Sequence, residues 1–219
     1  MERHFDTELI QLKQQLLKMG ALAEAMIESA VKSLVERDSA KLEQIFRQEQ
    51  EVNSLQLAVD EDCLRLMALY QPTAGDLRFL LGVTKINAEL ERLGDQAVNI
   101  GEIVERLLKE PQLKPLIDIP KMAGIASSMV RDSLNAFVDR DIAQAQAVLL
   151  LDDQLDDLRN RVVEELIEFM TREPGSVSRA VQLISVARIL ERIGDHATNI
   201  AEAVIFVVQG RDIRHHSQQ

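Results

Sequence analysis

The chain contains little of what breaks, cross-links or anchors a fold: its 219 residues include 5 Pro, 9 Gly, 1 Cys and no Trp, and aromatic residues make up 3%. The single cysteine, Cys63, has no internal disulfide partner, and one thiol is not a set of metal ligands. No apolar run approaches the ~18 residues that span a membrane, and the N-terminus lacks the apolar core of a signal peptide. We therefore expect a cytoplasmic protein that reaches a membrane only through partners.

Positive charge is also scarce, because 25 Lys and Arg residues face 36 Asp and Glu residues and the formal net charge is -11. This balance argues against nucleic acid as the main partner, since clustered Lys and Arg carry that binding. The sequence also lacks a Gly-rich phosphate loop, a Gly-x-Ser-x-Gly motif, a Cys/His dyad and the Glu-x-x-His motif of di-iron bundles. No residue pattern sets up a nucleophile or a tuned acid–base pair, so we predict that the chain is not an enzyme.

What remains is a composition that builds helices. Hydrophobic residues make up 46% of the chain, and Ala, Leu, Val, Glu, Gln and Arg dominate it. Apolar residues recur with a period of about 3.6, which is typical of amphipathic helices. The pattern predicts six long helices, at about residues 6–35, 40–69, 76–108, 121–138, 142–170 and 176–208. Helices of this length that are joined by tight turns run antiparallel.

The second half of the chain repeats the first. Residues 91–104 and 191–204 are identical at nine of fourteen positions, whereas the fourteen positions before them share only Leu90 with Leu190. The turn at 36–38 recurs at 139–141, and residues 110–120 hold three of the five prolines. We predict an all-α protein of two tandem three-helix bundles, at residues 1–109 and 121–210, with a linker at 110–120 and a tail at 211–219.

An apolar seam runs along the third helix of each half in steps of three and four residues, which is the spacing of a packed helix face. The seam positions are Phe79, Val83, Ile86, Leu90, Leu93, Ala97, Ile100, Val104 and Leu107, and then Leu183, Val186, Leu190, Ile193, Ala197, Ile200, Val204 and Val207. Gly94 and Gly194 lie within these helices, where a glycine costs about 1 kcal/mol relative to alanine. We therefore expect another part of the protein to approach the backbone closely at both glycines.

Opposite the seam, each third helix carries two carboxylates one turn apart: Glu91 and Asp95 in the first half, and Glu191 and Asp195 in the second. Their Cβ atoms should lie about 5–6 Å apart. Like charges at this spacing repel, and a divalent or trivalent cation would reverse that effect. Because the pairs recur while their flanks differ, we interpret these four residues as candidate metal ligands. His196 points away from this acidic stripe, and we interpret it as a surface histidine.

The first helix carries Glu24 and Glu28 in the same helical phase as the acids of the third helix. Helices one and three of a three-helix bundle run parallel and can be neighbours, so we expect these acids to converge with Glu91 and Asp95 on shared cations. In the second half, Asp132 takes the role of Glu28 by phase, but Ser128 stands where a second acid is wanted. We expect the second site to be weaker or differently ligated.

Carboxylate sites select Fe, Mn, Mg or Ca, with Zn possible, and the sequence does not choose among these ions. Two other interpretations stay open: the stripe is an ordinary solvated face, or it serves a metal-dependent hydrolase or a metal-storage protein. Arg92, Arg192, Asn99 and Asn199 flank the stripe, and they serve either as surface salt-bridging groups or as contacts to a partner.

Together these motifs resemble the PhoU family. The resemblance rests on the twinned Glu-Arg-Leu/Ile-Gly-Asp-x-Ala-x-Asn-Ile-x-Glu motif, on PTAGDLR at 72–78, on LLKMG at 16–20 and on the Arg-Asp turns, and it covers essentially the whole chain. It implies two repeated three-helix bundles whose Glu/Asp-x-x-x-Asp motifs bind clusters of iron or other metals, often in a homodimer. By position, the metal candidates are Glu91, Asp95, Glu191 and Asp195, supported by Glu24, Glu28 and Asp132.

The same resemblance implies a negative regulator of phosphate uptake and signalling. Proteins of this family are thought to bridge the phosphate ABC transporter, through its ATPase subunit, and the membrane sensor histidine kinase of the phosphate-starvation two-component system. Asp76 and Arg78, in the PTAGDLR break, join the flanking arginines and asparagines as candidate partner contacts.

Overall fold

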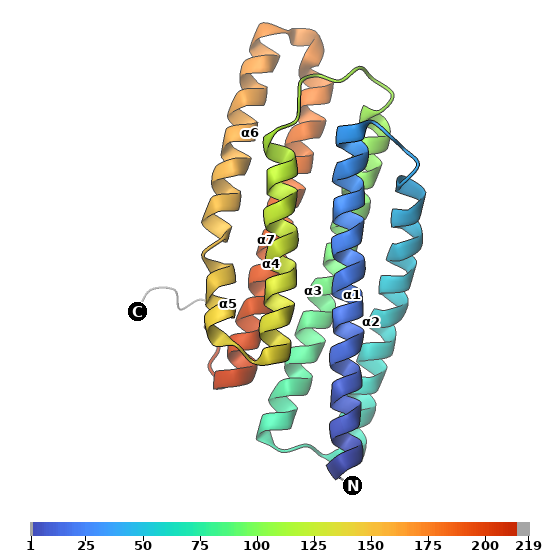
Figure 1. Ribbon diagram of the computed structural model, residues 1–219, viewed down its shortest axis with the longest axis vertical. Coiled ribbons are helices and arrows are strands. Elements are labelled where there is room, and N and C mark those ends of the chain that lie inside the picture. Colours follow the sequence, from blue (N-terminus) through green and yellow to red (C-terminus); the bar gives the residue numbers. More distant parts are fainter. Residues whose placement is uncertain (1, 214–219) are drawn as a thin grey trace.

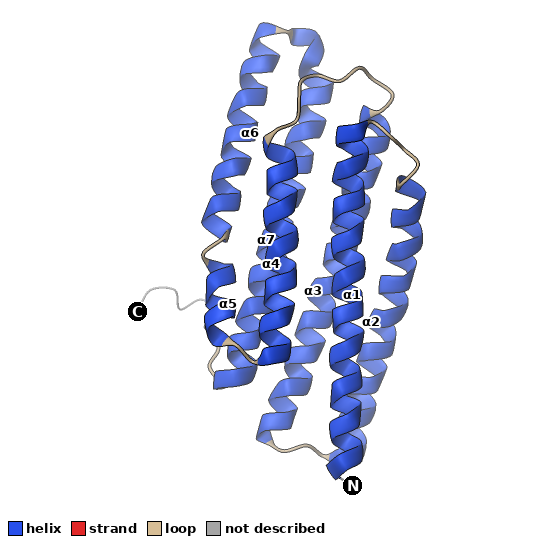
Figure 2. Ribbon diagram, viewed as in Figure 1, coloured by secondary structure: helices blue, strands red, loops and turns tan. Residues whose placement is uncertain are grey.

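The computed structural model describes residues 2–213, and no strand occurs among them (Figure 2). The helices are α1 (Glu2–Glu36), α2 (Leu42–Tyr70), α3 (Ala74–Leu107), α4 (Asp118–Asp139), α5 (Ile142–Leu149), α6 (Asp152–Arg172) and α7 (Val177–Gln209), with a short 3-10 helix, η1 (Pro174–Ser176), before α7. Residues 214–219 of the predicted tail lie outside the described part of the chain.

The long helices form one elongated body (Figure 1). α1 and α4 lie side by side on one face with α3 and α7 behind them, while α2 covers one flank and α5 with α6 covers the other. α3 runs antiparallel to α7, and α1 runs antiparallel to α4. The two repeats therefore meet through their first and third helices. None of the described helices combines the length and the apolar character needed to cross a membrane.

The predicted all-α class and the six long helices are confirmed, with one interruption. The second helix of the second repeat is split at Leu150 and Leu151, between α5 and α6. At this break the Leu151 amide donates to the carbonyl of Val148, three residues back, at 3.1 Å. An amide within an α-helix donates to the carbonyl four residues back instead. The apolar period continues across the break, so the sequence pattern does not reveal it. α4 begins at Asp118, inside the segment predicted as a linker.

The predicted seams form the core, because every seam position of α3 and α7 is buried. The repeats come closest where the helices carry glycine. A Cβ placed on Gly20 of α1 would lie 2.1 Å from Leu134 Cδ1 of α4, and one on Gly82 of α3 would lie 2.1 Å from Val207 Cγ2 of α7. The turns that end α1 and α4 also correspond, since Arg37 (φ 57°) and Arg140 (φ 55°) both adopt the left-handed conformation.

Candidate metal centres

The first carboxylate cluster lies between α2 and α3. Glu91 and Asp95 stand one turn apart on α3, and Glu49 of α2 is near enough to act on the charge of Glu91. Asn53, one turn after Glu49, donates its Nδ2 to Glu49 Oε1 at 2.5 Å. Burial raises the pKa of Glu91, and the negative charges of Asp95 and Glu49 raise it further. The first repeat thus offers three carboxylates and one amide along the interface between α2 and α3.

The second cluster lies between α6 and α7 and contains four carboxylates. Asp152 and Asp156 of α6 act electrostatically on the acids of α7, Glu191 and Asp195. Burial raises the pKa of Asp152, Glu191 and Asp195, and repulsion among the acids raises it further. Arg159 of α6 offsets part of this repulsion, because its Nη2 lies 3.1 Å from Asp156 Oδ1 and 3.4 Å from Glu191 Oε1.

In each repeat, a glycine of the third helix faces the second helix beside the cluster. A Cβ placed on Gly194 would lie 2.5 Å from Leu155 Cδ2 and 3.6 Å from Asp152 Oδ1. A Cβ placed on Gly94 would lie 3.4 Å from Val52 Cγ1. The expected close approach is therefore confirmed at Gly194, whereas the contact between Gly94 and α2 has the length of an ordinary van der Waals contact.

The acids of α1 do not join those of α3. Glu24 faces α4, where Arg131 Nη2 lies 2.5 Å from its Oε2 and where Asp132 acts on its charge. Burial raises the pKa of Glu24, and the negative charges of Glu28 and Asp132 add to that effect against the opposing effect of Arg131. The expectation that Glu24 and Glu28 converge with the acids of α3 is wrong, because this side of α1 faces the other repeat.

The expected equivalence of Asp132 with Glu28 is also wrong. The buried methionines of α1 and α4 correspond at an offset of 103 residues: Met19 with Met122, and Met26 with Met129. At this offset the counterpart of Glu28 is Arg131, whose guanidinium pairs with Glu24 across the repeat junction. Helical phase alone does not decide whether Arg131 or Asp132 is the counterpart of Glu28. The register of the buried methionines decides it.

The expectation that Ser128 leaves the second cluster short of a ligand is wrong as well. Ser128 lies on α4 and donates its hydroxyl to a carbonyl of its own helix at 2.8 Å, whereas the further acids come from α6. The sequence carried a signal for them. Glu49 with Asn53, and Asp152 with Asp156, repeat the four-residue spacing of the other motifs, and the two pairs lie 103 residues apart, as the turns do.

Both clusters have the donor chemistry of a hard cation site. Carboxylate and amide oxygens suit Fe, Mn, Mg and Ca, and a cation would relieve the repulsion that raises the pKa of Glu91 and Asp152 after burial. In the second cluster the Arg159 guanidinium already stands in for such a cation. Among residues 2–213, no three Asp, Glu, His or Cys side chains are placed to hold a metal ion as they stand.

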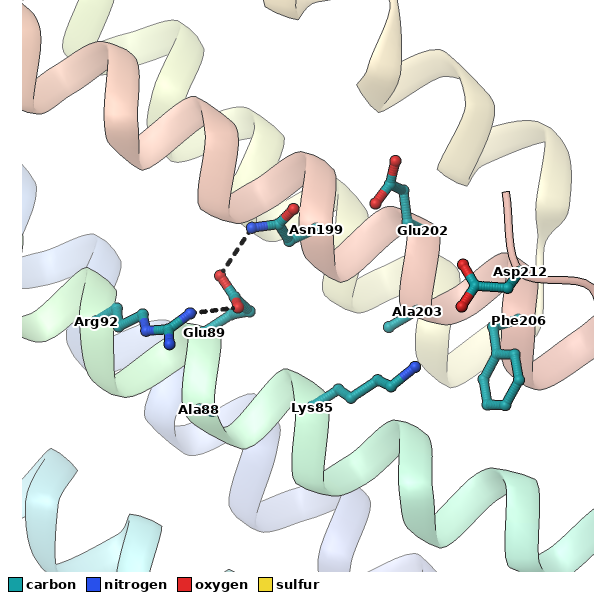
Figure 3. A pocket seen from close by; sticks show the side chains of 9 residues that line it. All are labelled: Lys85, Ala88, Glu89, Arg92, Asn199, Glu202, Ala203, Phe206 and Asp212. Carbon is teal, nitrogen blue, oxygen red and sulfur yellow. Dashed lines mark hydrogen bonds and ion pairs between the residues drawn. The ribbon is translucent and has the colours of Figure 1, made fainter. Parts of the chain in front are cut away.

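A pocket of about 270 Å³ lies between α3 and α7, where the repeats meet (Figure 3). Two of the predicted contact residues, Arg92 and Asn199, line it and point toward Glu89. Glu89 accepts hydrogen bonds from Arg92 Nη1 at 2.9 Å and from Asn199 Nδ2 at 3.1 Å. On the other side of the pocket, Lys85 Nζ lies 4.4 Å from the centroid of the Phe206 ring. Asn199 thus joins α7 to α3 across the repeat junction, whereas Arg92 pairs with Glu89 within α3.

Glu89 also pairs with His196, whose Nδ1 lies 2.7 Å from Glu89 Oε2. The side chains of His196 and Glu89 are only 16% and 14% exposed, so the interpretation of His196 as a surface histidine is wrong. Burial alone would raise the pKa of Glu89, but the hydrogen bonds from His196 and Asn199 and the nearby positive charges lower it overall. The packing of α7 against α3 buries a residue that the helical phase places beside the acidic stripe.

The other predicted contact residues lie at separate places along α3 and α7. Asn99 of α3 and Arg192 of α7 are exposed. Asp76 lies in the first turn of α3, and Arg78 lies next to the end of α7, where its Nε is 3.5 Å from the position of a Cβ on Gly210.

The comparisons with known proteins agree with this architecture. The PhoU domain model matches residues 16–104 and again residues 119–204. Curated relatives named phosphate-specific transport system accessory protein PhoU homolog are 36% identical in Pseudomonas putida, over 98% of this chain and 84% of the relative, and 38% identical in Aquifex aeolicus, over 95% and 94%. The crystal structure of PhoU from Pseudomonas aeruginosa, 34% identical, superimposes with a TM-score of 0.91 over 94% of this chain and 100% of that chain. The phosphate transport system regulatory protein PhoU from Streptococcus pneumoniae, 28% identical, gives 0.87 over 95% and 98%. The resemblance found in the sequence is therefore confirmed, and the chain belongs to the PhoU family.

Proposed function

We propose that this chain is a cytoplasmic regulator of phosphate uptake that acts as an accessory protein of a phosphate-specific transport system. When phosphate is plentiful, it docks on the ATPase subunit of the transporter and on the sensor histidine kinase of the phosphate-starvation two-component system. Docking lowers both phosphate uptake and the starvation signal.

The observation that supports this proposal is the pair of PhoU domains within one helical body. Relatives named for phosphate transport match the chain over most of their own length as well as its length. A body of long packed helices with two carboxylate clusters and a charged pocket at the repeat junction offers several surfaces to basic partners.

Deletion of the gene tests the regulatory role. In phosphate-rich medium the deletion strain should express alkaline phosphatase and take up phosphate as if it were starved, and the wild-type gene should restore repression. Affinity capture from phosphate-replete cells in mild detergent should recover the ATPase subunit or the kinase, and starvation should reduce that recovery. Unchanged phosphatase expression and uptake in the deletion strain would contradict the proposal.

We also propose that the two carboxylate clusters bind metal ions, with iron favoured by the family resemblance and Mn, Zn, Mg or Ca as alternatives. Glu49, Asn53, Glu91 and Asp95 would hold the ions of the first cluster, and Asp152, Asp156, Glu191 and Asp195 those of the second. A bound ion supplies positive charge that neutralises the carboxylates. These residues then hold the second helix of each repeat against the third.

Metal analysis after gentle purification tests this role. The double variant Glu91→Gln with Asp95→Asn should lose the metal of one cluster, and Glu191→Gln with Asp195→Asn should lose the metal of the other. A matched control changes Glu24→Gln, which removes a carboxylate outside both clusters. If the gently purified wild-type protein carries no metal, the acids are an ordinary solvated face. Turnover of phosphate esters that disappears in the double variants would favour a metal-dependent hydrolase.

We further propose, from the family resemblance, that the protein is a homodimer. Light scattering coupled to size-exclusion chromatography should then give twice the mass of the chain, and a single-chain mass at micromolar concentration would contradict this.

A further inference from the structure

Arg159 lies within the second carboxylate cluster and has no counterpart in the first. On α6 it follows Asp156 by three residues, and its Nη2 lies 3.1 Å from Asp156 Oδ1 and 3.4 Å from Glu191 Oε1. Its side chain is 29% exposed, and its Nε is buried without a hydrogen-bond partner. The guanidinium therefore lies between α6 and α7 and contacts candidate ligands from both helices.

This guanidinium supplies the positive charge that a metal ion would supply. An arginine in a protein stays charged at any physiological pH, and its planar fork suits carboxylate oxygens. The guanidinium occupies Asp156 Oδ1 and Glu191 Oε1, so a metal ion that takes these two oxygens displaces it, and the repulsion between the two positive groups adds to the competition. Metal and Arg159 are therefore alternative occupants of the same carboxylates.

The first repeat lacks such a competitor. Gln56 occupies the position equivalent to Arg159, 103 residues earlier, and it brings no charge to the cluster. Its backbone carbonyl accepts a hydrogen bond from Asn87 Nδ2 at 2.9 Å, which ties α2 to α3 without an ion pair. The charge of Arg92, the neighbour of Glu91 on α3, opposes the rise in the pKa of Glu91, but its guanidinium pairs with Glu89 at 2.9 Å, which lies outside the cluster.

We propose that Arg159 is a built-in counter-ion that competes with metal for the second cluster and thereby raises the metal concentration at which that cluster fills. This inference rests on the proposed metal-binding role of the clusters. Filling the second cluster releases Arg159 from Asp156 and Glu191 toward solvent on the outer flank of the molecule. Metal binding then frees a guanidinium on that flank, whereas the first repeat has Gln56 at the equivalent position and no guanidinium to free.

The test exchanges the two equivalent residues in the full-length protein. Arg159→Gln gives the second cluster the residue of the first, and Gln56→Arg does the reverse. Arg159→Lys is the matched control, because it keeps the positive charge but removes the planar fork. Each variant is freed of metal with a chelator and titrated with Mn²⁺ by calorimetry, and its circular dichroism is compared with that of the wild type.

Each titration is assigned to one cluster by removing the other. The background Glu91→Gln with Asp95→Asn leaves only the second cluster, and Glu191→Gln with Asp195→Asn leaves only the first. We expect Arg159→Gln to tighten Mn²⁺ binding at the second cluster by about tenfold, within the usual range of coupling between two binding events. Gln56→Arg should weaken binding at the first cluster, and Arg159→Lys should lie closer to the wild type than Arg159→Gln does.

The outcomes separate this inference from the metal proposal beneath it. Unchanged Mn²⁺ affinity in Arg159→Gln, in a helical protein that binds Mn²⁺ at the second cluster, overturns the counter-ion role and leaves the metal proposal standing. A wild-type protein and an Arg159→Gln variant that both fail to bind Mn²⁺ at the second cluster overturn this inference, and the absence of any metal from the gently purified wild type would overturn the metal proposal as well. The thermal midpoint adds a second readout, since Arg159→Gln without metal should melt below the wild type and gain more from Mn²⁺.

Discussion

In the first repeat, three carboxylates (Glu49, Glu91 and Asp95) lie between the second and third helices beside an asparagine. In the second repeat, four carboxylates lie between the equivalent helices beside Arg159. The helices that carry the two sets correspond closely, down to a glycine of the third helix that faces the second helix in each pair. The duplicated backbone thus preserves where polar groups stand, while the charge at an equivalent position can differ between the repeats. Repeat symmetry predicts the place of a site in this molecule, and individual side chains decide how its charge is balanced.

The largest expected contrast concerns the packing of the first helices across the repeat junction. Gly20→Ala installs the residue type that the second repeat has at the equivalent position, Ala123, but the new Cβ would lie 2.1 Å from Leu134 Cδ1. Overpacking of this kind should lower the free energy of unfolding by about 2 kcal/mol. Gly124→Ala, where no atom lies within 4 Å of the new Cβ, should raise it by up to about 1 kcal/mol. Urea unfolding measures both, and equal effects would contradict the described junction.

The next contrast concerns the polar side of that junction, where Glu89 of the first repeat corresponds to buried Ile189 of the second. Glu89→Gln should cost about 2 kcal/mol at neutral pH, because a charged acceptor of several hydrogen bonds is lost. Burial tends to raise the pKa of Glu89, but its hydrogen bonds to His196 and Asn199 lower it overall. The charged form therefore favours folding, and its contribution is full above the unfolded pKa of about 4.3 and is lost as the pH falls through the folded pKa.

Denaturation at several pH values tests this sign. The stability difference between wild type and Glu89→Gln should shrink toward zero in acid, whereas Ile189→Val should show a loss that does not depend on pH. A difference for Glu89→Gln that grows in acid would show that the carboxylate does not hold the junction.

A smaller contrast concerns the glycines beside the two clusters. Gly194→Ala places a Cβ 2.5 Å from Leu155 Cδ2, a buried side chain with little room to move, so we expect a net loss of about 1 kcal/mol. Gly94→Ala places its Cβ 3.4 Å from Val52 Cγ1, close to ordinary contact, so the helix-forming gain of up to about 1 kcal/mol should prevail. Opposite signs in thermal melts would confirm that the second repeat is packed more tightly at its cluster.

The smallest expected effect comes from the excess charge of the second cluster. Burial raises the pKa of Asp152, and the charges of Asp195 and Asp156 raise it further. The neutral form therefore favours folding: its contribution is present below the unfolded pKa of about 3.9 and is lost as the pH rises through the folded pKa. In metal-free protein, Asp152→Asn should raise stability by about 0.5 kcal/mol at neutral pH, and the gain should vanish in strong acid. Mn²⁺ should reverse the order of the two proteins at neutral pH.

Much of the fold could be predicted from the sequence, because the burial of an apolar stripe is a local property of each helix. The seam residues of α3 and α7, the turns and the repeat follow from spacing alone. The partners of Glu24 and His196 could not be predicted in this way. Helical phase gives the side of a helix that a residue occupies, and the element that covers this side depends on how the two repeats pack. The break before Asp152 was also hidden, since the apolar period passes through it.

Only half of the residues in each candidate site could be predicted from the sequence. The motif pairs on α3 and α7 stood out because they are nearly identical, whereas Glu49 with Asn53 and Asp152 with Asp156 share their spacing but not their residue types. Comparing the halves by register rather than by identity would have found them.

α2 and α6 lie on opposite flanks of the body (Figure 1), so the clusters between α2 and α3 and between α6 and α7 stand on opposite sides of the repeat junction. In the proposed regulatory role, with one partner on each flank, one copy of the molecule holds both partners at once without competition for the same surface. A partner bound on one flank is kept at a fixed distance from a partner on the other, and the packed helices between them set its effective concentration, whatever its abundance in solution. The thickness of two three-helix layers thus acts as a molecular spacer.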